Sequence, residues 1–230
     1  MNRHSQVVTG ARVTHEDSQV CDLEAVRRES ERELLAELRA DEAVREAYAL
    51  QTCHRVEVYV VTESETEGRE VLDAVGFGPD EAHVMAHEES IRHLMRVAAG
   101  LESVVVGEDQ IIGQVRDAYE NATAVDAVGP ILDEVVPKAI RVGERARTET
   151  KINDGVVSLG SAAVELADED VGLADASATV VGSGEMGTLT LIALDRAEVG
   201  DLTVANRTVD NAQNMVDVHD VDATVVGLDS

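Results

Sequence analysis

The spacing of hydrophobic positions predicts a mixed α+β region over the first part of the chain. Apolar and β-branched residues alternate with polar ones over 6–13 and 47–61, which indicates two strands. Apolar residues that recur every three or four positions indicate helices in several other places. These are an exposed amphipathic helix over 23–39, a pattern from 90 to 121 broken near Gly100 and Gly107, a short segment between Pro130 and Pro137, and helices over 138–150 and 156–167.

The chain then changes to short apolar strands that alternate with helices. Strands are predicted over 178–182, 202–206 and 223–227, with helices over 185–197 and 208–217 between them. A β-α-β-α-β run of this kind implies a parallel sheet with right-handed crossovers. We therefore expect an α/β protein of two domains: an N-terminal α+β domain over 1–155 and an incomplete Rossmann-like domain over 156–230.

Composition limits the class of protein. Hydrophobic residues make up 44% of the chain, enough for a core. No apolar run approaches the about 18 residues that span a bilayer, and the N-terminus lacks the apolar region of a signal peptide, so we expect a cytoplasmic protein. Asp and Glu total 46 against 19 Lys and Arg, a net charge of -27. Because molar salt shortens the Debye length to about 3 Å and screens such repulsion, we interpret the chain as halophilic.

The cysteine content excludes a disulfide framework and a cysteine-rich zinc site. Cys21 and Cys53 are the two cysteines and form no CxxC pair, and we expect no metal site. Cys53 lies in the predicted strand 47–61, on the same polar face as Arg55, whose charge would favour the reactive thiolate. A single cysteine is also commonly an inert buried residue, and the pattern alone leaves both interpretations open.

A GxGxxG motif is the strongest local signal. It follows the predicted strand 178–182 and opens the next helix: Gly182, Ser183, Gly184, Glu185, Met186 and Gly187. In this context the first glycine permits a tight turn, the second lets the backbone approach a pyrophosphate, and the third lets the helix pack closely on the strand. The motif therefore predicts a dinucleotide site, although glycine-rich turns can also serve chain reversal alone.

The end of the second predicted strand indicates which dinucleotide is bound. An NAD enzyme usually places Asp or Glu there, whereas this chain has Asn206, Arg207 and Thr208. An arginine can pair with the 2′-phosphate of NADP, which an acidic residue would repel. The alternative is that Arg207 is a solvated loop residue and Thr208 caps the next helix. The pattern favours NADP.

Other polar residues carry little information by spacing alone. His93 lies on a predicted helix beside Arg92 and Arg96, and this pattern is typical of a surface or boundary histidine. Gln110 and Gln114 share one helical face, where glutamines are usually solvated.

Several segments, in order, resemble the glutamyl-tRNA reductase family. TCHRVEVYV (52–60) is similar to the family's segment around its nucleophile, although His54 stands where the family commonly has Asn. The stretch 91–119 resembles the family's signature region. Residues 157–167, 180–189 and 204–208 resemble its nucleotide-binding domain.

The resemblance implies reduction of glutamyl-tRNA(Glu) to glutamate-1-semialdehyde, the first step of tetrapyrrole (porphyrin) biosynthesis. Cys53 would take the glutamyl group as a thioester, and hydride from NADPH would reduce it. His93 would assist acyl transfer. The resemblance further implies a set of substrate-contacting residues, namely Thr52, His54, Arg55, Ser103, Glu108, Asp109, Gln110 and Gln114. The expected partners are glutamyl-tRNA(Glu) and glutamate-1-semialdehyde aminotransferase.

Family members continue beyond the end of this chain, through the second half of the nucleotide domain and a helical dimerisation domain. We therefore expect either a fragment or a shortened relative that has lost hydride transfer, in both cases without the family's homodimer contacts. Two other interpretations stay open. One is a non-reducing regulatory protein that captures charged tRNA or a partner reductase. The other is a shikimate-dehydrogenase-like enzyme, which accounts for 178–227 and leaves 52–119 unexplained.

Overall fold

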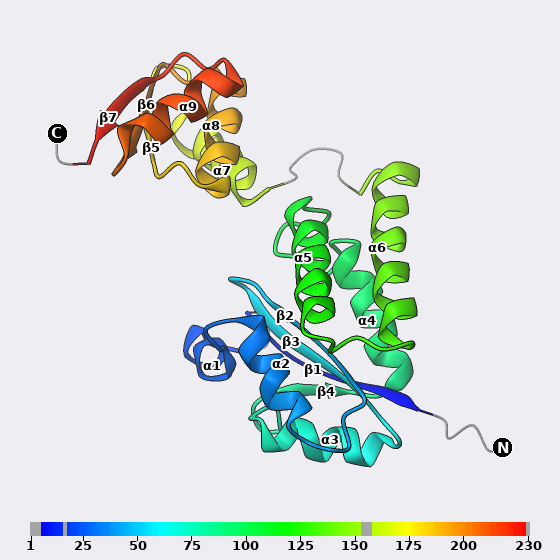
Figure 1. Ribbon diagram of the computed structural model, residues 1–230. Helices are drawn as coiled ribbons and strands as arrows, with labels where there is room; N and C mark the ends of the chain where they lie inside the picture. Colours follow the sequence, from blue (N-terminus) through cyan, green and yellow to red (C-terminus); the bar gives the residue numbers. More distant parts are fainter. Residues whose placement is uncertain (1–5, 16–17, 153–157, 229–230) are drawn as a thin grey trace. The chain divides into compact units, whose positions relative to one another are not determined.

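The computed structural model of the protein describes residues 6–15, 18–152 and 158–228 (Figure 1). The chain forms two compact units. The first unit contains Met1–Ser103 and Gln110–Ile152, and the second contains Val104–Asp109 and Asn153–Ser230. The boundary predicted near residue 155 lies outside the described residues.

A four-stranded antiparallel sheet is the centre of the first unit. Its strands are β1 (Val7–Thr14), β2 (Glu46–Gln51), β3 (Arg55–Thr62) and β4 (His83–Met85), in the order β2-β3-β1-β4. β1 pairs with β3 along its whole length, from Val7 opposite Thr62 to Thr14 opposite Arg55. With the helices between strands, this order is a βαββαβ arrangement.

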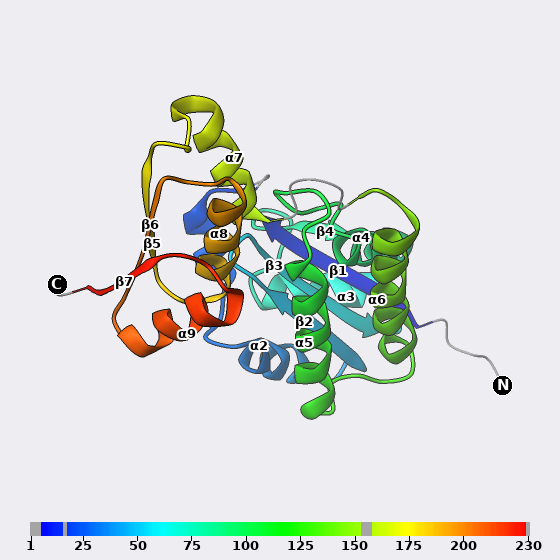
Figure 2. The same ribbon diagram turned by 90° about the horizontal axis from the view of Figure 1, so that it is seen from above.

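Helices cover both faces of this sheet. They are α1 (Val20–Val26), α2 (Glu31–Arg39), α3 (Glu65–Ala74), α4 (His87–Ala98), α5 (Gln110–Ala124) and α6 (Leu132–Glu149). α4, α5 and α6 lie on one face, and Figure 2 views the unit from that side. α2 and α3 lie on the opposite face.

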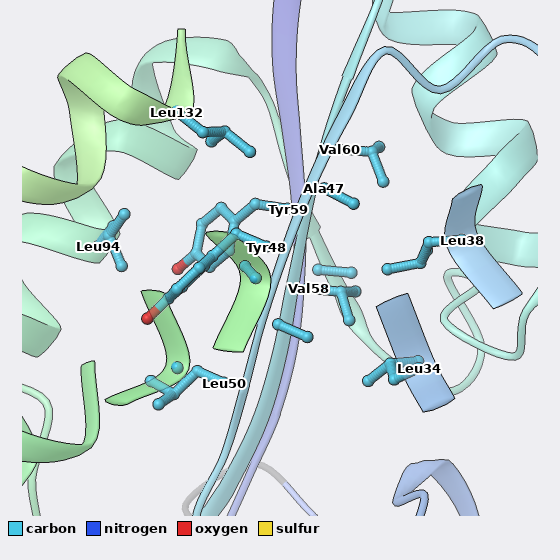
Figure 3. Packing of buried hydrophobic residues seen from close by; sticks show 14 of the residues in the cluster. Leu34, Leu38, Ala47, Tyr48, Leu50, Val58, Tyr59, Val60, Leu94 and Leu132 are labelled. Atoms are coloured by element: carbon cyan, nitrogen blue, oxygen red, sulfur yellow. The ribbon is translucent and has the colours of Figure 1, made fainter. Parts of the chain in front are cut away.

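The core is therefore two-sided. In Figure 3, Tyr48, Tyr59 and Leu94 lie on one side of the sheet, and Leu34 and Val58 lie on the other. All of these side chains are at most 1% exposed. Because both faces are covered, β3 carries buried residues at every position, as expected of a strand that lies between two layers of helices.

The amphipathic helix predicted over 23–39 is wrong as a single element. The chain breaks after α1 and restarts at Ser30, whose hydroxyl accepts a hydrogen bond from the N–H of Glu33 at 3.2 Å. A serine at this position supplies the acceptor that the first turn of a helix lacks. The second piece, α2, is also not an exposed surface helix, because Leu34, Leu35 and Leu38 are fully buried.

The single strand predicted over 47–61 is also wrong. It is the hairpin β2–β3, joined by residues 52–54, which we call the thiol turn. Apolar residues continue on both sides of the turn because both strands are buried on both faces. Cys53 is thus a turn residue and not a strand residue.

Pro137 does not end a segment as predicted but lies inside α6. A proline removes one helical N–H, yet the helix continues through this position. Val136 and Ala139 are fully buried. The start of α6 is held from a distance, since the carboxylate of Glu46 accepts from the N–H of Ile131 at 3.0 Å and of Leu132 at 2.7 Å.

The second unit agrees with the predicted alternation of strands and helices. Its elements are α7 (Leu159–Val171), β5 (Ser177–Val181), α8 (Glu185–Arg196), β6 (Asp201–Asn206), α9 (Val209–His219) and β7 (Thr224–Gly227). The strands form a parallel sheet in the order β5-β6-β7. Leu191, Val204 and Ala212 are fully buried in a core separate from that of the first unit.

Within the described residues, no helix combines the length and apolar character needed to cross a membrane.

Candidate active site

Backbone hydrogen bonds fix the thiol turn. The N–H of Thr52 donates to the carbonyl of Arg55 at 2.9 Å, and the N–H of His15 donates to the carbonyl of His54 at 3.0 Å. The guanidinium of Arg27 donates to the carbonyl of Thr52. The turn is therefore held against the ends of β1 and α1, while the Cys53 side chain is exposed. Such a thiol is accessible to a substrate and held by a fixed backbone.

The immediate neighbour of the thiol is an imidazole. Sγ of Cys53 lies 3.1 Å from Nδ1 of His54. The ring of His54 meets the ring of His15 edge-on, with 5.4 Å between centroids and an interplanar angle of 66°. The N–H of His54 also donates to Oγ1 of Thr52 at 3.2 Å.

Arg55 does not lie beside the Cys53 thiol, as the predicted strand suggested. Its side chain is buried and its Nη1 donates to Oε1 of Glu57 at 2.9 Å, while Nη2 donates to the carbonyl of Glu102. The structure therefore places His54 against the thiol, and Arg55 in a buried ion pair.

His93 is not the surface or boundary residue that its helix suggested, because it is only 7% exposed. Its Nε2 lies 3.0 Å from Oε1 of the fully buried Glu57. The hydroxyl of Tyr59 donates to the other oxygen of Glu57 at 2.7 Å. A buried carboxylate of this kind fixes the orientation of the imidazole ring.

The electrostatics of the cluster follow from these contacts. Burial raises the pKa of Glu57, but the charge and hydrogen bond of His93 and the charge of Arg55 together outweigh it, and the pKa falls from 4.5 to about 2. Burial and the Glu57 carboxylate raise the pKa of Tyr59 well above its usual value of 10. Glu57 is thus a buried anion at neutral pH.

Glu57 is the residue that sequence analysis missed. The available signal was a carboxylate in the middle of an apolar strand, where a charged residue is rare unless it is paired. Its partner His93 is 36 residues away, so local patterns could not show the pair.

The segment after α4 contacts the Glu57 network through Glu102. The carbonyl of Glu102 accepts from Arg55, and its carboxylate pairs with Arg96. The next residue, Ser103, is 6% exposed and its hydroxyl has no hydrogen-bond partner in the described part of the chain. An unsatisfied buried hydroxyl beside such a network is available to a ligand.

The remaining predicted substrate residues are distributed over both units. Gln110 and Gln114 are half-buried on α5 of the first unit. Glu108 and Asp109 belong to the segment Val104–Asp109 of the second unit. Within the first unit, His54 lies against Cys53, and Arg55 and His93 both contact Glu57.

The three glycines of the GxGxxG motif each occupy a position that suits the role predicted for them. Gly182 has φ of 104°, which L side chains rarely adopt. A Cβ on Gly184 would meet nothing within 4 Å, so the space before this N-cap of α8 is open. A Cβ on Gly187 would lie 2.3 Å from the carbonyl oxygen of Gly182, so only glycine permits this close packing.

A groove of about 450 Å³ runs in front of this motif. It is lined by Gly182, Ser183, Gly184, Asn206, Arg207, Thr208, Asn211 and Leu228. Arg207 and Thr208 are exposed there. Thr208 occupies the N-cap position of α9, but its side chain makes no capping hydrogen bond. Glu185 and Met186, in the first turn of α8, are exposed beside the groove. A larger cavity of about 720 Å³ in the first unit is lined by none of the predicted site residues.

Comparison with known proteins identifies the family. The family model described as the N-terminal domain of glutamyl-tRNA(Glu) reductase matches residues 11–150. The chain belongs to the glutamyl-tRNA reductase family. A second model, shikimate / quinate 5-dehydrogenase, matches residues 165–230. This match is confined to the second unit, and it supports a Rossmann-like nucleotide-binding fold there.

Individual relatives agree with this assignment. The chain is 51% identical to the glutamyl-tRNA reductase of Haloarcula marismortui, with 100% of this chain and 51% of the relative covered. It is 50% identical to that of Halobacterium salinarum, with 99% and 53% covered. The solved glutamyl-tRNA reductase from Methanopyrus kandleri has a TM-score of 0.67 at 38% identity, covering 96% of this chain and 54% of that one. The chain thus spans about half the length of these glutamyl-tRNA reductases.

Proposed function

We propose that the chain carries the acyl-transfer and cofactor-binding parts of an NADPH-dependent glutamyl-tRNA reductase. The reaction is the reduction of glutamyl-tRNA(Glu) to glutamate-1-semialdehyde through a thioester on Cys53, which begins tetrapyrrole synthesis. The observation that carries this proposal is the exposed Cys53 thiol on a fixed turn, in the unit that buries the His93–Glu57 pair.

Acyl transfer suits a thiol in this setting. Sγ of Cys53 attacks the ester carbon of the glutamyl group, the bond from that carbon to the ribose oxygen of the tRNA breaks, and the glutamyl group stays on sulfur. A thiolate is a good nucleophile at neutral pH and a good leaving group in the following step. The thiol turn contributes Thr52 and His54 to the substrate site.

His93 contributes acid–base chemistry in this proposal. Its Nε2 is held by Glu57, which leaves Nδ1 as the ring nitrogen available to substrate. The Glu57 carboxylate fixes the ring orientation. Its bond to Arg55 ties the base of the thiol turn to the same buried anion.

The second unit supplies the nucleotide site. The residues proposed to hold NADPH are Gly182, Ser183, Gly184, Glu185, Met186, Gly187, Asn206, Arg207 and Thr208. The open space before Gly184 and the free N-terminus of α8 suit a pyrophosphate. Arg207, exposed in the groove, suits a 2′-phosphate. Bound NADPH supplies the hydride that reduces the thioester carbon.

The test uses the 230-residue chain in molar KCl with glutamyl-tRNA, with and without NADPH. Semialdehyde that requires both NADPH and Cys53 supports the whole proposal. Free glutamate that requires Cys53 but not NADPH supports acyl transfer and overturns hydride transfer in this chain. Cys21→Ser, which removes the other exposed thiol, is the matched control for Cys53→Ser. Release of neither product would overturn the proposal and favour a tRNA-binding role.

A further inference from the structure

We propose that His54 accepts the proton of the Cys53 thiol and holds the resulting thiolate as a contact ion pair. The proposal rests on the proposed function only where the thiolate goes on to attack glutamyl-tRNA. The thiol–imidazole pair itself can be tested without tRNA.

The geometry of the pair carries the inference. Nδ1 of His54 lies 3.1 Å from Sγ of Cys53, within hydrogen-bonding distance for sulfur. A neutral Nδ1 accepts the S–H proton, and after transfer the N–H donates to the sulfur anion. This is the arrangement by which a histidine activates a cysteine nucleophile.

The backbone that carries the imidazole is held in place, and a second ring lies against the imidazole. The backbone of His54 is fixed on both sides, by its N–H to Thr52 and by its carbonyl to the N–H of His15. The edge of the His15 ring closes one side of the His54 ring at 5.4 Å between centroids.

The other charged or titratable groups named around the thiol turn contact other atoms than Sγ of Cys53. His15, at the end of β1, contacts the imidazole and not the thiol. Arg27, which follows α1, donates to the carbonyl of Thr52. Arg55, at the start of β3, donates to Glu57 and to the carbonyl of Glu102. Among these groups, His54 is the one with a hydrogen bond to Sγ.

Charge and salt together make a contact partner important. At low salt a charge of -27 opposes the formation of one more anion, and molar salt screens that repulsion. In molar salt the Debye length is about 3 Å, so distant arginines give little compensation. A hydrogen-bonded imidazolium acts at contact distance, where salt screens it least.

With glutamyl-tRNA, the thiolate held by His54 attacks the ester carbon. The sulfur–carbon bond forms, the bond between the acyl carbon and the ribose oxygen breaks, and the ribose oxygen takes a proton from His93, the acid–base residue of the proposed function. His54 gives its proton to water, from which His93 recovers the proton that it has lost. No oxidant or reductant is required in this step.

The experiment measures alkylation of Cys53 by iodoacetamide in the full chain, in molar KCl. Cys21→Ser is the background, so that Cys53 is the single reactive thiol. A neutral reagent is chosen because the acidic surface neither attracts nor repels it. Rates are compared at about pH 7 and at about pH 10, above the ordinary ionisation range of a thiol.

We expect His54→Asn to slow alkylation about three- to tenfold at pH 7, because fewer thiols are ionised, although the more basic thiolates react somewhat faster. At pH 10, where the thiol is ionised in both proteins, the variant should react as fast as the background or somewhat faster, which shows that the thiol is accessible. The matched control is His83→Asn, which removes an exposed histidine that is paired with Glu89. It should match the background at both pH values.

Equal rates for His54→Asn and the background at pH 7 would overturn the proposal, as would an equal slowing in His83→Asn. Thioester formation from glutamyl-tRNA is measured on the same proteins. A pH-dependent effect of His54 without thioester in any variant would support the thiol–imidazole pair and overturn the proposed function instead.

Discussion

Glu57 and His93 meet at 3.0 Å inside the first unit, with Oε1 of a strand residue against Nε2 of a helix residue. The same oxygen accepts from Arg55, and the other accepts from Tyr59. One buried carboxylate therefore fixes the start of β3, the middle of α4 and the base of the thiol turn. This shared role leads to the first two predictions.

The stability of the first unit should depend on pH through Glu57. Its pKa is lowered from 4.5 to about 2 in the folded protein, so its contribution is fully present above about pH 4.5 and is lost as the pH falls towards 2. The full shift corresponds to ~3 kcal/mol. Urea unfolding of wild type and of Glu57→Gln is measured at several pH values in this range. The difference between their free energies of unfolding is the contribution of Glu57, because the other carboxylates are the same in both proteins. The difference between the two proteins should shrink towards acid pH. A constant difference would contradict the assignment.

His93→Asn should slow thioester formation from glutamyl-tRNA by about 100-fold or more, the usual contribution of a general acid or base. Alkylation of Cys53 by iodoacetamide should stay near wild type, because His93 contacts Glu57, whereas the thiol contacts His54. Tyr59→Phe, which removes one hydrogen bond to Glu57 and keeps His93, should retain much more acyl transfer. Equal losses in both variants would mean that His93 acts only through stability.

Two glycines of the GxGxxG motif should respond differently to alanine. Gly184→Ala should leave unfolding unchanged, because its Cβ meets nothing within 4 Å, and should weaken NADPH binding at least about tenfold by filling the space before α8. Gly187→Ala should destabilise the second unit by about 1–3 kcal/mol, because its Cβ would lie 2.3 Å from the carbonyl of Gly182. Thermal unfolding and NADPH titration separate the two effects. The reverse pattern would remove the proposed roles.

Arg207→Ala should discriminate between the two nicotinamide cofactors. Loss of a charge-assisted contact to a 2′-phosphate costs about 1.5–3 kcal/mol, so NADPH should bind about 10- to 100-fold more weakly. NADH, which lacks that phosphate, should bind nearly as before. Arg196→Ala is the control, since Arg196 is an exposed arginine in the last turn of α8 and does not line the groove. Similar losses for both cofactors would assign Arg207 a structural role.

Sequence reasoning succeeded where structure is determined locally. The strands and helices of the second unit carry their own signals, because each strand is short and apolar and Gly182 marks the first turn by its positive φ. The thiol turn carries no such signal: Thr52, Cys53 and His54 are not typical turn residues, and the apolar pattern continues on either side of them.

The side-chain contacts within the candidate site were not predictable from the sequence. The resemblance pointed to Cys53 and His93, but not to Glu57, since its contact with His93 depends on how α4 packs on the sheet. Likewise, the alternation of side chains along the predicted strand 47–61 placed Cys53 and Arg55 on the same face. The hairpin instead turns Arg55 into the core and leaves His54 beside the thiol.

The bond from Glu46 to the first turn of α6 also has a consequence for how the chain folds. The donors at Ile131 and Leu132 are 85 and 86 residues away from their acceptor, so this helix start cannot be completed by its own neighbourhood. During synthesis β2 leaves the ribosome well before α6, and the acceptor is available when the donors emerge. A circular permutant that begins after β2 would reverse that order, and its α6 would have to wait for the other end of the chain.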